Sequence, residues 1–134
     1  MASRPELVAL YSRFVGRLWT DRLVEPITLE LCRLRIAQLH RDGAGMAERT
    51  AVAAVSEDLV AALHDWPTSS VFTDAHRAAL AVCELFVIDA HSVTDDIVGK
   101  LCVHFPADEI VALVTAFGLF DGFTRFRLAQ RGHL

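Results

Sequence analysis

The cysteines are the most reactive side chains of this 134-residue sequence, and their spacing limits the chemistry they could share. Cys32, Cys83 and Cys102 stand 51 and 19 residues apart, and Cys83 and Cys102 both fall on predicted apolar helix faces. Zinc sites usually place cysteines two to four residues apart, and disulfide frameworks use an even number. The spacing therefore predicts neither a metal site nor a disulfide framework. It indicates reduced thiols in a cytoplasmic protein.

A second group of reactive side chains lies in the first third of the chain. His40 and Asp42 are two residues apart, and Arg49 follows after two glycines. Because two ligands are too few for a zinc site, we expect no metal and no other cofactor. Glu30 is an acid within an otherwise apolar stretch, which indicates either proton transfer or an ion pair with Arg33 or Arg49. A salt bridge between Asp42 and Arg49 is a further structural expectation.

Helices alone are predicted to position these residues. The sequence has no alternating β-branched run between turns and no Asn-Gly or Asp-Gly hairpin signal. Pro26 suits the first position of a helix, and Ser56, Thr73 and Thr94 suit the position that caps one. The expected helices cover residues 5–20, 26 to 39 or 41, 46–55, 57–64 and 74–89, with one more after Thr94 and a last one from Pro106.

Composition excludes several classes of protein. Hydrophobic residues make up 53% and charged residues 22%, which rules out a disordered chain. The longest stretch without a charged residue, Ile110–Phe120, has 11 residues, whereas a membrane span needs about 20. The net charge is −4 and the isoelectric point is about 5.8, so no basic surface invites nucleic acid.

Apolar residues cover two sides of the predicted helices at 27–39, 75–90 and 110–123. A chain of this length has few places to bury such helices, so we predict a homo-oligomer. The alternative is a monomeric bundle around one central helix. No internal repeat or linker divides the chain, which favours a single domain over residues 1–134.

The segment Leu34-Arg35-Ile36-Ala37-Gln38-Leu39 resembles the helix that leads into the active site of the carboxymuconolactone decarboxylase and alkylhydroperoxidase D-like family. Further segments resemble the family in order and spacing: Ser56–Val60, Trp66 with Phe72 and Thr73, Arg77–Ala81, His91–Asp95 and Phe105–Val111. The resemblance covers about Leu23 to Leu128. It implies the all-α alkylhydroperoxidase D-like fold, with a family core at about 23–128 and an additional helix at about 5–20.

Redox members of that family carry Cys-x-x-Cys-x-x-x-His after this helix and a Glu before it. Transferred onto this chain, the cysteines fall on Asp42 and Gly45 and the histidine on Arg49, while the acid is kept as Glu30. A peroxide-reducing dithiol needs an attacking and a resolving thiol. The resemblance therefore implies a family member without thiol peroxidase activity that binds a small acidic or apolar molecule in the former active-site pocket.

Two alternatives remain open. One is a cysteine-independent, decarboxylase-like lyase or an antioxidant enzyme, in which Arg49 would hold a carboxylate and Glu30, Asp42 or His40 would move the proton. The other is a non-catalytic oligomeric interaction subunit. The site residues implied are thus Glu30, Asp42 and Arg49 for catalysis, with His40 and Arg49 for ligand binding. A working pocket predicts a cavity of a few hundred Å3 beside them.

Overall fold

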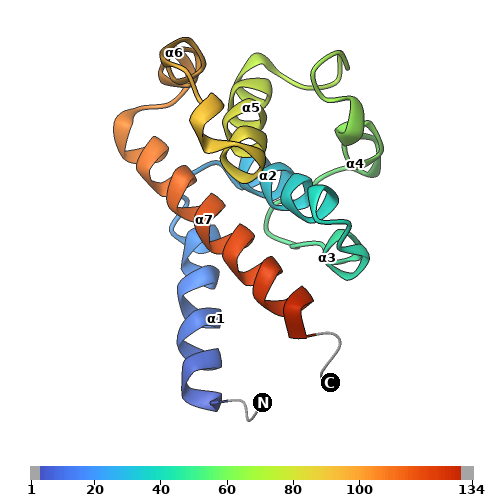
Figure 1. Cartoon of the computed structure of the whole chain (residues 1–134), viewed down its shortest axis with the longest axis vertical. Coiled ribbons are helices and arrows are strands. Elements are labelled where there is room, and N and C mark those ends of the chain that lie inside the picture. The colour runs from blue at the N-terminus through green and yellow to red at the C-terminus, as the bar shows by residue number, and fades with distance from the viewer. Residues whose placement is uncertain (1–3, 131–134) are drawn as a thin grey trace.

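The structure, a computed structural model, describes residues 4–130 with every side chain in that range except that of Val8. Helices form all of the regular secondary structure of the described residues, as Figure 1 shows. They are α1 (Pro5–Thr20), α2 (Pro26–Leu39), α3 (Gly43–Ala47), α4 (Glu57–Ala62), α5 (Asp74–Ile88), α6 (Asp95–His104) and α7 (Ala107–Gln130), with 3-10 turns η1 (Leu63–Asp65) and η2 (Ala90–Ser92). The predicted all-α fold is confirmed.

Local signals set the beginnings of these helices. Pro5 and Pro26 stand at the first positions of α1 and α2, where a missing N–H group costs nothing. The side chains of Ser56, Thr73 and Thr94 each accept a hydrogen bond from a backbone N–H in the first turn of α4, α5 and α6. The caps that the sequence predicts at these three residues are confirmed.

The helix predicted at 46–55 is wrong. α3 begins earlier and ends at Ala47, and Glu48 is extended. Long-range hydrogen bonds account for the difference. The guanidinium of Arg33 in α2 donates to the carbonyl oxygens of Gly45 and Glu48 at 3.0 and 2.7 Å. The N–H of Thr50 donates to Glu30 at 2.7 Å. Backbone groups that a continuing helix would use are thus engaged by side chains of α2.

The central helix is α2, which contacts α5 on one side and α7 on another. In Figure 1 it lies between α5 and α3, to the right of α7. Leu34 of α2, Leu80 of α5 and Phe117 of α7 are completely buried. Two apolar sides on α2 are therefore satisfied within one chain, as a helix at the centre of a bundle requires.

α1 is attached to the bundle mainly by its C-terminal end. Leu18 and Trp19 are buried, and the Trp19 ring lies 6.2 Å from that of Phe120. Farther along, Tyr11 stacks on Phe123 with ring centroids 4.1 Å apart. Figure 1 shows the N-terminal half of α1 extending away from the other helices, whereas the C-terminal half of α7 runs past α3. The predicted helix over residues 5–20 forms, but its N-terminal half lies outside the core.

Large apolar side chains stay exposed where α1 and α7 extend from the bundle. Those on α1 are between 49% and 56% exposed, and those on α7 are 42% and 51% exposed. We call this set the α1–α7 apolar face: Leu7, Leu10, Phe14, Phe123 and Phe126. None of the described helices combines the length and the apolar character needed to cross a membrane.

Candidate functional site

The turn after α2 places the first residue of the site. Arg41 adopts a left-handed conformation with φ of 54°. Its N–H donates to the carbonyl of Gln38 at 3.1 Å, and the N–H of Asp42 donates to that of Ala37 at 2.8 Å. This pair of bonds is the Schellman motif that closes a helix C-terminus. It turns the chain so that Asp42, which is buried, becomes the N-cap of α3.

The Asp42 carboxylate lies against Gly45, and these are the two positions that the family resemblance assigns to cysteines. One of its oxygens accepts the N–H of Gly45 at 3.1 Å, and the other accepts the guanidinium of Arg127 from α7. A Cβ atom at Gly45 would overlap this carboxylate and would lie 3.2 Å from the Cβ of Ala37. The expected salt bridge between Asp42 and Arg49 is wrong, because α7 supplies a nearer cation from 85 residues away.

Glu30 is the second buried carboxylate of the site, and its side chain is fully buried. One of its oxygens accepts a hydrogen bond from the guanidinium of Arg33, and the other accepts one from the N–H of Thr50 at 2.7 Å. The ion pair with Arg33 that the sequence indicates is therefore confirmed. Arg33 also bonds to the carbonyl of Gly45, so Glu30 and Asp42 are linked through one short stretch of backbone.

Arg49 lies on the surface and forms no hydrogen bond or ion pair with Glu30 or Asp42. Its guanidinium donates to the carbonyl oxygens of Met46 and, at 3.0 Å, Glu48. It also forms an ion pair with the exposed carboxylate of Glu57 at 3.4 Å. Its charge is thus engaged by its own loop and by α4.

His40 connects the end of α2 to α7. Its Nε2 atom lies 2.6 Å from the carboxylate of Asp121, and the Arg125 guanidinium lies 3.1 Å from the same carboxylate. This contact is separate from the hydrogen bonds around Asp42. The structure therefore brings Glu30 and Asp42 together, and it places Arg49 and His40 in other interactions.

A pocket of about 230 Å3 opens between α1 and α7, beside the buried carboxylates. Its residues are Tyr11, Val15, Arg33, Glu48, Phe120, Phe123, Thr124 and Arg127. Neither this pocket nor a larger one between α5 and α6 is lined by Glu30, Asp42 or Arg49. Instead, the arginine partners of the two buried carboxylates line it.

Arg33 and Arg127 thus line the pocket although the sequence assigned neither to the site, and it indicated Arg33 only as an ion-pair partner of Glu30. Arg33 belongs to the few polar positions of an apolar helix, which is a signal that could have found it. Arg127 lies in the last turn of α7, where a basic residue is expected to interact with the helix dipole. Tyr11 lines the same pocket and is half-buried, and burial raises the pKa of its hydroxyl while the charge of Arg127 opposes that rise.

The cysteines lie elsewhere. Cys32 and Cys83 are fully buried, and the Cys83 thiol donates to the carbonyl oxygen of Cys32 at 3.6 Å. Burial raises the pKa of Cys83, which disfavours the reactive thiolate. Cys102 is free and exposed, so its expected apolar placement is wrong. α6 packs through Leu101 and Phe105, which turns Cys102 toward solvent.

No family model matches the chain. The uncharacterized protein YnjA from Escherichia coli strain K12 is 31% identical over an alignment of 136 positions, which covers 94% of this chain and 71% of that protein. Among solved structures, ATU0492 from Agrobacterium tumefaciens matches with a TM-score of 0.80 and 21% identity, over 96% of this chain and 90% of its own. It is described as a protein of unknown function and a candidate antioxidant defence protein, AhpD. The chain therefore belongs to the family of YnjA and has the AhpD-like fold.

Proposed function

We propose that this protein binds a small molecule in the pocket between α1 and α7 and has no thiol peroxidase activity. The observation that carries the proposal is the full engagement of the buried acids. Each of the four carboxylate oxygens of Glu30 and Asp42 accepts a hydrogen bond from an arginine or a backbone N–H. A carboxylate held in this way stabilises the walls of a pocket, whereas a proton relay needs an oxygen that faces substrate.

The two positions that the family resemblance assigns to cysteines support the absence of peroxidase activity. Asp42 has no thiol to oxidise, and Gly45 has no room for a side chain beside the Asp42 carboxylate. The cysteines that could substitute are unsuitable, since Cys32 and Cys83 are fully buried and Cys102 is on another helix. Thiol chemistry requires an accessible thiolate and a second thiol within reach.

The pocket favours an apolar ligand over the acidic alternative. Its arginines, Arg33 and Arg127, are already paired with buried carboxylates, so a bound anion would find little unbalanced positive charge. Tyr11, Phe120 and Phe123 supply aromatic walls, which suit a flat apolar ring. The volume of 230 Å3 lies below the usual range for drug-sized ligands, about 300–1,000 Å3. A single-ring molecule with one neutral polar group fits these properties.

A non-catalytic interaction subunit is the second candidate, and the α1–α7 apolar face favours it. A cytoplasmic homo-oligomer is compatible with both candidates. The lyase alternative would use Arg49 to hold a carboxylate, but the contact of Arg49 with Glu57 supports a structural role for it.

Binding is tested with benzyl alcohol and benzoate, a neutral and an anionic probe of the same shape. We expect benzyl alcohol to shift the NMR signals of Tyr11 and Thr124. The Val15→Trp variant fills the pocket and should remove these shifts, while Arg13→Trp on the exposed side of α1 should keep them. Shifts that survive in Val15→Trp, or an absence of shifts in the unsubstituted protein, would contradict the binding proposal.

The peroxidase prediction needs a separate assay. With cumene hydroperoxide and dithiothreitol, we expect no protein-dependent consumption of peroxide. Turnover that is lost in Cys83→Ser or in Cys102→Ser would overturn this part of the proposal. Because Cys102 is exposed, the second variant remains informative even if the first does not fold.

A further inference from the structure

We infer that a second site, between α5 and α6, binds a small organic anion with a flat apolar body, and that Lys100 is its main charged contact. The pocket there has a volume of about 540 Å3, more than twice that of the pocket beside α1. It shares no residue with that pocket, so this inference does not depend on the function proposed above.

The pocket between α5 and α6 exists because the side of α5 that faces α6 carries small side chains. Asp74, Arg77, Ala78 and Ala81 recur at helical spacing on α5 and therefore share one side. Alanines in the middle of that side leave room that larger apolar residues would fill. α6 presents Ile97, Lys100, Val103 and His104 across the gap at a similar spacing.

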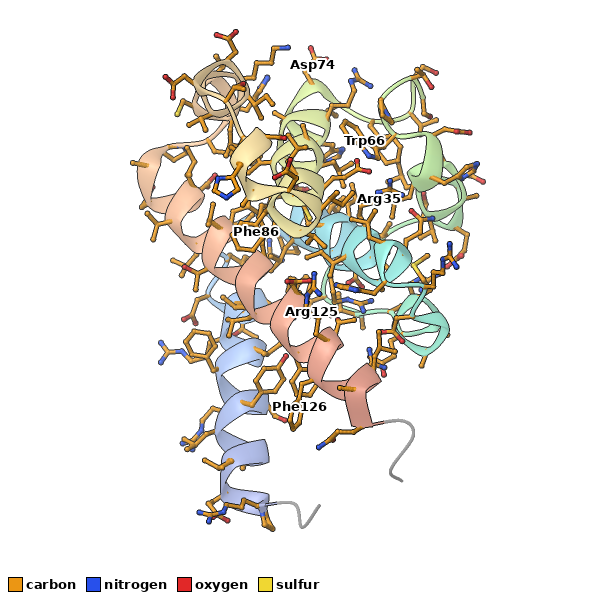
Figure 2. The ribbon with its side chains drawn as sticks, in the orientation of Figure 1. Arg35, Trp66, Asp74, Phe86, Arg125 and Phe126 are labelled. Atoms are coloured by element: carbon orange, nitrogen blue, oxygen red, sulfur yellow. The ribbon has the colours of Figure 1, made fainter. Side chains whose placement is uncertain are left out.

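Trp66 forms a flat wall of the pocket and is held in position. Its indole N–H donates to the carboxylate of Glu84 at 2.8 Å. The other oxygen of Glu84 accepts the guanidinium of Arg35 from α2 at 2.6 Å. Figure 2 shows Trp66 beside α5, with Asp74 at one end of that helix and Arg35 toward the centre of the molecule. A tethered indole face is suited to stacking against a flat ligand.

The charged groups of the pocket do not balance. Asp74 is 2.8 Å from Arg77, and this partner lowers the pKa of Asp74 by hydrogen bonding and by charge. Arg77 also donates to the carbonyl of Ser69 at 3.0 Å, which uses two of its five N–H donors. The ammonium group of Lys100 makes no hydrogen bond or ion pair with residues 4–130, and the imidazole of His104 lines the same pocket. The pocket therefore has a surplus of positive charge.

These features define the class of ligand. An anionic group would bind Lys100 and the remaining donors of Arg77, while the body of the ligand would lie on Trp66 and the alanines of α5. The volume falls in the range of ordinary small-molecule sites, about 300–1,000 Å3. Aromatic monocarboxylates combine the charge, the flat shape and the size that the pocket accepts.

The experiment uses the chain's single lysine. Reductive methylation with 13C-formaldehyde keeps the positive charge and places an NMR label on Lys100 and on the N-terminal amine. We expect benzoate to shift the Lys100 signal in a saturable way, with benzyl alcohol producing a much smaller shift. A Lys100 signal that does not respond to benzoate, or that responds equally to both probes, overturns the inference.

Variants provide a second, independent readout by titration calorimetry. Loss of a charge-assisted hydrogen bond in Lys100→Gln should weaken benzoate binding about tenfold. Lys100→Arg should retain most of the affinity. The matched control is Arg13→Gln, which removes one exposed positive charge on α1, outside both pockets, and should leave binding unchanged. Equal weakening in Lys100→Gln and Arg13→Gln would mean that net charge alone attracts the anion, which contradicts a site at Lys100.

Discussion

The side chain of Asp42 occupies the volume next to the Cα atom of Gly45. An aspartate at position 42 therefore requires a residue without a side chain at position 45. The Asp42 carboxylate occupies the volume that a Cβ atom at Gly45 would need, and it bonds to the Gly45 N–H and to Arg127. The same carboxylate caps α3 and holds α7 against the turn after α2. At these positions the chain thus carries an ionic contact that stabilises the fold.

A methyl group at Gly45 should therefore destabilise the protein. We expect Gly45→Ala to lower the free energy of unfolding by about 1–3 kcal/mol, the usual cost of overpacking a well-filled region. Urea denaturation measures the change, with an unchanged m-value as the sign that only stability is affected.

Gly43 offers a matched control in the same helix, since a Cβ atom there meets nothing within 4 Å. Gly43→Ala should be neutral or slightly stabilising, because alanine has the higher helix propensity. Equal stabilities of the two variants would show that the Asp42 carboxylate can move aside at no cost, contrary to the packing described here.

At the scale of an element, α5 begins with a cap that is sensitive to pH. Thr73 accepts the N–H of His76 at 3.1 Å, and Nδ1 of His76 accepts the N–H of Thr73 at 3.4 Å. Burial lowers the pKa of His76 below its ordinary value of 6.5, and the carboxylate of Glu25 opposes this shift. Protonation at Nδ1 would remove the acceptor for Thr73, so the cap requires the neutral ring.

The stability of the protein should consequently fall as the pH drops below about 6.5, because the unfolded chain binds a proton at His76 more readily than the folded chain does. In His76→Gln, glutamine keeps the reciprocal capping bond but does not titrate. We expect the Tm of this variant to fall less between pH 7 and pH 5 than that of the unsubstituted protein.

The control for this experiment is His91→Gln, which removes an exposed histidine outside the cap. An NMR titration of His76 provides the direct check, with an expected pKa below 6.5. If His76→Gln loses stability with pH as steeply as the unsubstituted protein, the cap is not the origin of the pH dependence.

At the scale of the whole molecule, the α1–α7 apolar face is where we expect a second copy of the chain to bind. Its five large apolar side chains lie on the part of α1 and α7 that extends from the bundle. Large apolar side chains that stay exposed on two helices in contact favour an association site. A second copy of the chain would cover it by pairing the same face twice.

Light scattering tests this expectation. The chain mass is 14.8 kDa, and at micromolar concentration we expect a mass at least twice as large. The Leu10→Glu/Phe14→Glu double variant places two charges in the apolar face and should be monomeric. Arg13→Glu, a charge change on the exposed side of α1, serves as the control and should assemble normally. A monomeric unsubstituted protein would contradict the proposed association.

The beginnings of most helices are determined by sequence alone, because the signals at these positions act over one turn. Pro5, Pro26, Ser56, Thr73 and Thr94 each affect only the N–H groups next to them, so their effect does not depend on the rest of the fold. The two apolar sides of α2 are also visible in the sequence, but residues 75–90 and 110–123 show the same pattern, so only the contacts of α2 with α5 and α7 identify it as the central helix.

Only the tertiary structure determines which hydrogen-bond and ion-pair partners the polar residues have. Asp42 pairs with Arg127, 85 residues away, where the sequence indicates Arg49. The end of α3 depends on Arg33 of α2, because its guanidinium donates a hydrogen bond to the carbonyl oxygen of Gly45. The physical reason is that a buried charge must find a partner wherever the packing of helices places one, and distance along the chain has no influence on that choice.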